Sequence, residues 1–155
     1  MATRSTIALE FADGTVQQIY CHWDGYLSNN GEILLKHYSD PFKLRDLIDQ
    51  GDLSSLRPYV GTQHPFSYIG EMDSAEYDRL YGDMCTFYMR DRGETGCEAK
   101  KFKDFEDYAE SHQYEEYEYI LRKDGQWYVD QYGKGYTLLK DALEREQAAE
   151  ETLDA

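Results

Sequence analysis

The sequence predicts an α+β fold: a single domain whose antiparallel sheet is built from two hairpins plus a central strand, with three to four helices packed alongside. Two observations carry this prediction. Asp-Gly pairs at residues 13–14 and 124–125 are flanked by alternating apolar segments, which is the pattern of a tight β-hairpin. Segments of helical periodicity lie between and after these hairpins, and this order favours α+β over a parallel α/β arrangement.

The first half of the chain is expected to hold the first hairpin, two helices and several shorter pieces. Asn29 or Asn30 can cap a helix that runs to about residue 38. Asp40 and Pro41 suit the N-cap and first turn of a second helix, which ends at Gly51. The other expected elements are a hairpin of 5–11 with 16–23, a turn with a short helical piece at 51–56, a strand at 66–69, a helix at 74–80 and a strand at 84–90.

The second half centres on residues 102–121. Phe102, Phe105 and Ala109 share one side of a predicted amphipathic helix. Beyond residue 113 the period changes to two, which predicts a strand. The remaining expected elements are a hairpin of 114–123 with 126–132, a helix from Thr137 to about 149 and a frayed tail at 150–155.

Length and composition indicate one folded domain over residues 1–155, with an acidic, tyrosine-rich second half at about 102–149. No apolar run approaches the ~20 residues of a membrane span, and the N-terminus lacks a signal-peptide pattern. Three cysteines at unrelated spacings make no disulfide framework. We therefore expect a cytoplasmic protein.

Charge gives the strongest functional indication. The formal net charge is −15, and residues 104–155 carry 15 acidic and 5 basic side chains. Such a chain repels nucleic acid and anionic membranes and is attracted to basic grooves. Because aromatic residues make up 15% of the chain, it does not resemble a disordered acidic segment.

The candidate partner-binding surface follows from this charge. One interpretation of the acidic stretch is a solvated helix and strand, and the other is an anionic face with tyrosines that meets a basic, nucleic-acid-binding partner. The residues proposed for this face are Asp104, Glu106, Asp107, Glu110, Tyr114, Glu115, Glu116, Tyr117 and Glu118.

Catalytic chemistry finds less support. His22 and Asp24 would share one face of a strand, but two ligands fall short of a zinc site. Cys21 is expected to be a buried, inert strand cysteine. His37, His64 and His112 are isolated in sequence. We therefore predict no catalytic residues, no metal and no cofactor.

The string Tyr20-Cys-His-Trp-Asp-Gly-Tyr26, the Gly31–Tyr38 segment and the Leu47–Leu56 element resemble a family of small phage and prophage proteins whose activity is unassigned. The resemblance covers about the first third of the chain and implies a phage origin and a small α/β module, an N-terminal module at about 5–56. Together with the charge, it suggests an anti-defence inhibitor of a CRISPR effector or restriction enzyme in the bacterial cytoplasm. The chain would act as a monomer or homodimer.

DNA mimicry is one route to such inhibition, and spacing limits it. Alternate carboxylates on one strand recur about every 6.7 Å, whereas phosphates of one DNA strand recur about every 3.4 Å. Several elements would therefore have to align their acids. The alternatives are a non-mimic interaction module with a tyrosine-rich surface and a small enzyme with its site near His22 and Asp24.

Overall fold

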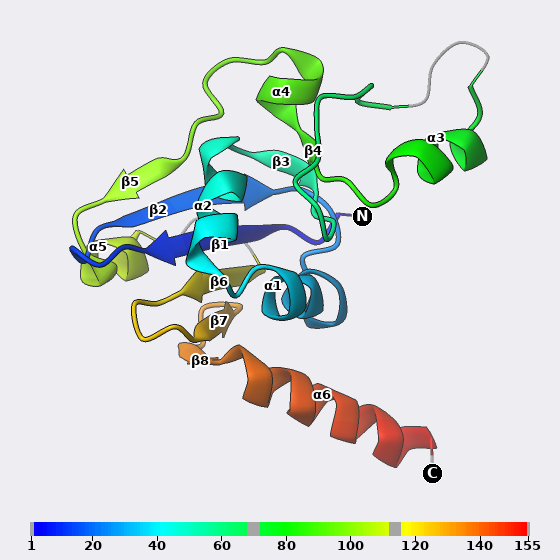
Figure 1. Cartoon of the computed structure of the whole chain (residues 1–155). Coiled ribbons are helices and arrows are strands. Elements are labelled where there is room, and N and C mark those ends of the chain that lie inside the picture. The colour runs from blue at the N-terminus through cyan, green and yellow to red at the C-terminus, as the bar shows by residue number, and fades with distance from the viewer. Residues whose placement is uncertain (1, 68–71, 112–115, 155) are drawn as a thin grey trace.

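The computed structural model describes residues 2–67, 72–111 and 116–154. An eight-stranded mixed sheet forms its centre, in the order β4-β3-β2-β1-β6-β7-β8, with β5 also paired to β2 (Figure 1). The strands are β1 (Ser5–Glu10), β2 (Val16–Cys21), β3 (Leu53–Ser55), β4 (Thr86–Phe87), β5 (Lys100–Phe102), β6 (Tyr117–Leu121), β7 (Trp127–Gln131) and β8 (Tyr136–Leu138). The helices are the π-helix η1 (Leu27–Gly31) and α1 (Glu32–His37), α2 (Pro41–Asp49), α3 (Ser74–Tyr81), α4 (Tyr88–Arg92), α5 (Phe105–Glu110) and α6 (Leu139–Asp154).

The prediction of a simple antiparallel sheet was wrong, although the α+β class stands. Both predicted hairpins form, β1 with β2 and β6 with β7. They join through their first strands, and because β1 and β6 run in the same direction this central pair is parallel. β2 and β3 are also parallel. The described residues hold six α-helices rather than three to four, and α4 forms in a segment where a strand was expected.

The two hairpin turns share one geometry. Phe11 N–H donates to Thr15 O at 2.8 Å, and Arg122 N–H donates to Gln126 O at 3.0 Å. The glycine of each Asp-Gly pair has a positive φ, 90° at Gly14 and 82° at Gly125. Glycine takes this conformation without steric cost, so the two pairs fix the turns and hence the register of both hairpins.

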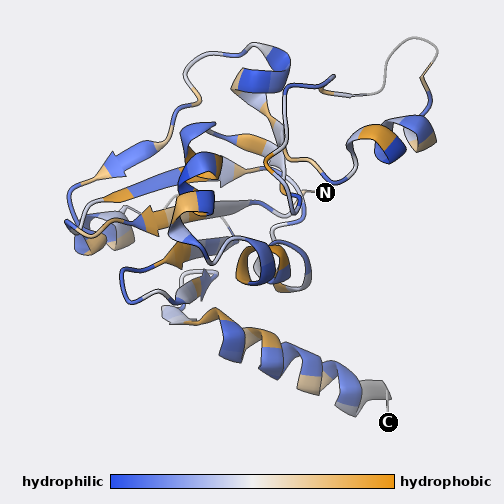
Figure 2. Ribbon diagram, viewed as in Figure 1, coloured by the Kyte–Doolittle hydropathy of each residue, from blue (hydrophilic) through white to orange (hydrophobic). Residues whose placement is uncertain are grey.

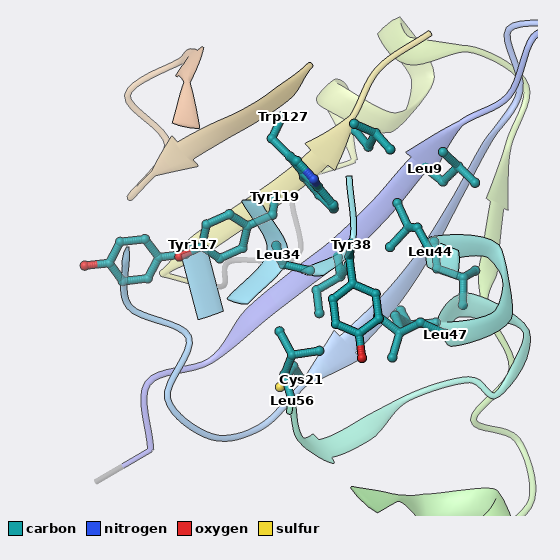
Figure 3. Packing of buried hydrophobic residues seen from close by; sticks show 14 of the residues in the cluster. Leu9, Cys21, Leu34, Tyr38, Leu44, Leu47, Leu56, Tyr117, Tyr119 and Trp127 are labelled. Carbon is teal, nitrogen blue, oxygen red and sulfur yellow. The ribbon is translucent and has the colours of Figure 1, made fainter. Parts of the chain in front are cut away.

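The main core lies on one face of the sheet, beneath α1 and α2. Leu44 and Leu47 of α2 and Tyr38 pack against strand residues such as Leu9 and Tyr119, and all are buried (Figure 3). A smaller cluster occupies the opposite face, where α5 covers β1, β2 and β6. Its members are Ala8, Val16, Tyr108 and Ile120, with Phe102, Phe105, Ala109, Tyr128 and Tyr136 partly buried around them.

Helix α2 begins at the capping residue that the sequence predicts, but the helix before it does not. Asp40 caps α2 by accepting a hydrogen bond from Phe42 N–H at 2.9 Å, as expected. The first expected helix differs: η1 precedes α1, and Asn30 is buried rather than capping. Helix α3 forms at the expected place, with Asp73 as its N-cap.

Three other expectations were wrong. Residues 53–55 form strand β3 instead of a helical piece. The expected strand at 84–90 ends at Phe87, because the Asp91 carboxylate accepts Phe87 N–H at 2.8 Å and so starts α4. Thr137 lies in β8 and does not cap α6. Part of the expected strand at 66–69 lies outside the described residues, and residues 66–67 are not in a strand.

Helices α3 and α6 extend away from the sheet (Figure 1). No residue of α3 is buried. Leu139 and Ala142 anchor the first turns of α6, whereas the described side chains at 147–152 are exposed. Figure 2 shows this difference as a helix that is most apolar near its start. Among the described residues, no helix has both the length and the apolar character needed to cross a membrane.

Candidate functional site

The four candidate carboxylates of helix α5 divide into two kinds. Asp104 is the N-cap and accepts Asp107 N–H at 2.8 Å, while Asp107 accepts Lys103 N–H at 3.2 Å. Both are half-buried and stabilise the start of the helix. Glu106 and Glu110 are exposed. Only these two carboxylates of α5 are therefore fully presented to solvent.

The two candidates on β6, Tyr117 and Glu118, lie inside the protein. Tyr117 is 9% exposed and Glu118 only 4%. Glu116 is half-buried, and its carboxylate accepts Arg4 N–H at 2.9 Å. Tyr114 and Glu115 lie outside the described residues. Glu118 therefore cannot add charge to an outer face beside α5, and the structure does not bring the described candidates into one exposed row.

Glu118 belongs instead to a row of facing polar residues across the sheet. The register places Thr6 opposite Tyr20 and Glu118, Glu118 opposite Asp130, and Asp130 opposite Tyr136. Tyr136 Oη donates to the Glu118 carboxylate at 3.3 Å, and Asp130 accepts Gly135 N–H at 2.9 Å. Alternation alone assigned Glu118 to solvent, but β6 is a central strand with both faces buried.

The Tyr20–Tyr26 string holds the end of β2 in place. The Gly25 carbonyl accepts Tyr119 Oη at 2.6 Å, and Gly25 N–H donates to Thr3 O at 2.8 Å. A Cβ at Gly25 would lie 2.7 Å from the Ser5 Cβ, so only glycine fits. Burial raises the pKa of the Cys21 thiol to about 12, which makes it a poor nucleophile.

The expected pairing of His22 with Asp24 on one strand face does not form. Strand β2 ends at Cys21, and Asp24 adopts a left-handed backbone with φ 58°. His22 Nδ1 lies 2.7 Å from Tyr20 Oη. Within the described ranges, no group of three or more His, Cys, Asp or Glu side chains is placed to hold a metal ion.

One polar cluster was not predicted from sequence. His64 Nε2 lies 3.2 Å from Thr86 Oγ1, and Asp91 lies 3.7 Å from His64 Nδ1. This resembles a nucleophile–base–acid order, but Nδ1 is closer to the Thr62 carbonyl at 2.9 Å, and Arg90 donates to the Asp91 carboxylate at 3.0 Å. His64 and Thr86 are 6% and 7% exposed. The geometry favours a buried anchor for the 57–67 loop.

A groove of about 490 Å³ lies between α6 and the β7–β8 turn. Tyr132 stands at its rim, 61% exposed, with φ 57°. A bulky residue rarely adopts this backbone, and such strain concentrates at functional sites. The residues that line the groove are Leu27, Gln131, Tyr132, Lys134, Gly135, Thr137, Ala142, Arg145 and Glu146.

Neighbouring negative charges disfavour ionisation of Glu146, the carboxylate that lines this groove. Burial raises the pKa of the Glu146 carboxyl, and the negative charges of Glu150 and Glu32 raise it further. Burial likewise raises the pKa of Tyr117 to about 12, with Tyr132 and Glu146 adding to the effect. The Tyr117 and Tyr132 ring centres are 5.5 Å apart. A cation beside Glu146 would therefore ease its ionisation. Lys134 and Arg145 also line the groove.

Comparison with known proteins gives no assignment. A scan of protein-family models, a search of curated proteins and a search of solved structures each found no match. The functional argument therefore rests on the geometry of the chain. The groove could not be found from sequence because its walls come from η1, the β7–β8 turn and α6. The one local signal of the groove in the sequence is Tyr132 before Gly133, because both take a positive φ and Tyr132 occupies a turn position that asparagine or glycine normally fills.

Proposed function

We propose that the chain is an acidic protein-binding module that docks on a basic, nucleic-acid-handling complex of the host and blocks it. The groove between α6 and the β7–β8 turn receives an arginine or lysine side chain of that partner. The class of partner follows from the net charge of −15 and from the resemblance to phage proteins, which together favour an anti-defence inhibitor.

The observation that carries the proposal is that the exposed Tyr132 and the carboxylate of Glu146 line the same groove. A tyrosine ring attracts a cation over its face, and a carboxylate whose ionisation is opposed by like charges gains from a nearby cation. Exposed tyrosines are also common among the residues that contribute most to binding energy. The groove therefore offers both an aromatic contact and an ionic one.

A groove contact has more support than imitation of a DNA strand. Exposed carboxylates at Glu106 and Glu110 lie on a six-residue helix, and Glu118 is buried. The exposed acids of α6 add to the net negative charge, which would speed association with a basic partner. Such steering weakens as salt rises, because the Debye length falls from about 10 Å at 0.1 M to about 3 Å at 1 M.

The test is capture of host proteins by the tagged chain from nuclease-treated bacterial lysate at low and high salt. Two variants remove the groove contacts: Tyr132→Asn, which keeps a residue that tolerates the left-handed backbone, and Glu146→Gln. Matched controls are Tyr59→Asn, whose ring is 60% exposed elsewhere, and Glu144→Gln, an exposed carboxylate of the same helix.

We expect the wild-type chain to retain a basic nucleic-acid-binding complex at low salt. Tyr132→Asn should weaken capture about thirtyfold, as for a residue that contributes about 2 kcal/mol. The two controls should bind like the wild type. Equal loss in Tyr59→Asn and Tyr132→Asn, or capture of an acidic partner, would contradict the proposal.

A further inference from the structure

A second cavity lies at the opposite end of the β6–β7 hairpin from the groove. Its volume is about 270 Å³, near the lower end of the ~300–1,000 Å³ typical of small-molecule sites. Leu9 and Leu121 are facing residues of the parallel β1–β6 pair and line the cavity together. Phe11 lines it from the first hairpin turn, and Pro41 and Phe42 line it from the first turn of α2.

The apolar lining continues onto the surface at Phe42. This ring is 79% exposed, more than any other large apolar side chain that the structure describes. Burial of apolar area is favourable by roughly 25 cal/mol per Å². A ligand that fills the cavity and covers Phe42 would therefore gain free energy from both surfaces.

Charge around the cavity is opposite to that of the whole chain. Arg45, Arg122 and Lys123 line it, with Glu10 as the one carboxylate among the lining residues that the structure describes. Arg122 donates twice to Glu10, at 3.1 and 3.3 Å, so these two charges compensate each other. Arg45 and Lys123 supply the excess positive charge at an otherwise apolar site.

Neither remaining cation is held by an ion pair of its own. Among the described residues no carboxylate lies within 4.0 Å of the Arg45 guanidinium or the Lys123 ammonium group. The guanidinium carbon of Arg45 lies 5.8 Å from the Phe11 ring centre, which places it at the apolar wall. Both cations are exposed and so are free to meet an anion that enters from solvent.

We propose that this cavity binds a small carboxylate with an apolar chain, its carboxylate at Arg45 and Lys123 and its chain against Leu9, Phe11 and Leu121. A mainly apolar lining with a few polar groups that fix orientation is the usual composition of such a site. The site is independent of the groove at Tyr132, because the two lie at opposite ends of β6 and β7.

The test uses octanoate and 1-octanol as a matched pair, with binding to the full chain measured by calorimetry and by methyl NMR. Octanoate should shift the methyl signals of Leu9 and Leu121 but leave those of Leu27, which lines the other groove. Octanol, which lacks the charge, should bind about tenfold more weakly.

Two variants separate the contribution of the positive charges to binding from that of the apolar cavity. Arg45→Gln with Lys123→Gln should reduce octanoate affinity about tenfold and leave octanol unchanged. Ala12→Trp, at an exposed turn position that lines the cavity, should weaken both ligands. Arg79→Gln, an exposed cation of α3, is the charge control.

Three results would overturn the proposal. These are no octanoate binding at millimolar concentration, equal affinity for octanoate and octanol, or shifts at Leu27 instead of Leu9 and Leu121. Because the NMR shifts are recorded on the wild-type chain, they decide the location even where a variant fails to fold. Loss of partner capture by Tyr132→Asn has no bearing on this result.

Discussion

Replacing Tyr119 with phenylalanine removes a single buried hydrogen bond between β6 and the loop after β2. Tyr119 is 0% exposed, and its hydroxyl donates to the Gly25 carbonyl at 2.6 Å. The phenylalanine ring fills the same space, so packing is preserved. The Gly25 carbonyl loses its side-chain donor in a site without access to bulk water.

The expected cost follows from this geometry. Leaving a buried acceptor unsatisfied costs about 1–3 kcal/mol, more than the net value of a typical hydrogen bond. For a chain of this length, each kcal/mol lowers the melting temperature by about 2–4 °C. Urea denaturation followed by tryptophan fluorescence should show a lower midpoint with an unchanged slope, because the surface exposed on unfolding is the same.

Tyr128→Phe is the matched control. Tyr128 Oη donates to the Asp124 carboxylate at the same distance, 2.6 Å, but at the surface. Water replaces the lost donor there, so the change should stay within about 0.5 kcal/mol. If both variants lose the same stability, or Tyr119→Phe loses none, then burial is not what makes the Tyr119 hydrogen bond important.

Three further outcomes follow from burial and charge. Burial opposes ionisation of Glu10, but hydrogen bonds and charge from Arg122 and Lys123 outweigh this effect and lower the pKa of Glu10. The ionised Glu10 therefore stabilises the fold above its ordinary pKa of 4.5, and this stabilisation is lost as the pH falls through the lowered pKa. Glu10→Gln should make the loss of stability with falling pH less steep below about pH 4.5. Ellman's reagent should modify half-buried Cys97 in the native chain and should reach the two buried thiols, Cys21 and Cys85, only in denaturant. If the native Cys97→Ser variant still reacts, then Cys21 and Cys85 are not buried as the structure has them. Ending the chain after Ala149 should change the free energy of unfolding by less than about 0.5 kcal/mol, because the described side chains beyond it are exposed, and a larger loss would show that they pack.

The sequence alone determined the elements whose signals lie within a few residues. The two Asp-Gly turns and the Asp40-Pro41 start of α2 were confirmed, whereas Tyr117, expected on the partner-binding face, is buried. Each depends on backbone preference or on strand alternation, which neighbouring residues specify without help from the rest of the fold.

Only the tertiary structure decided which strands meet and which faces they bury. Ser5 pairs with Tyr117, 112 positions later in the chain, and nothing in either segment encodes that partner. This parallel contact makes β6 a central strand and buries Glu118, which alternation had assigned to solvent. The groove at Tyr132 and the cavity at Phe42 arise in the same way, from turns and helices that are distant in sequence. Local chemistry sets the elements, and long-range packing, which must offset the entropy of closing long loops, sets the sites.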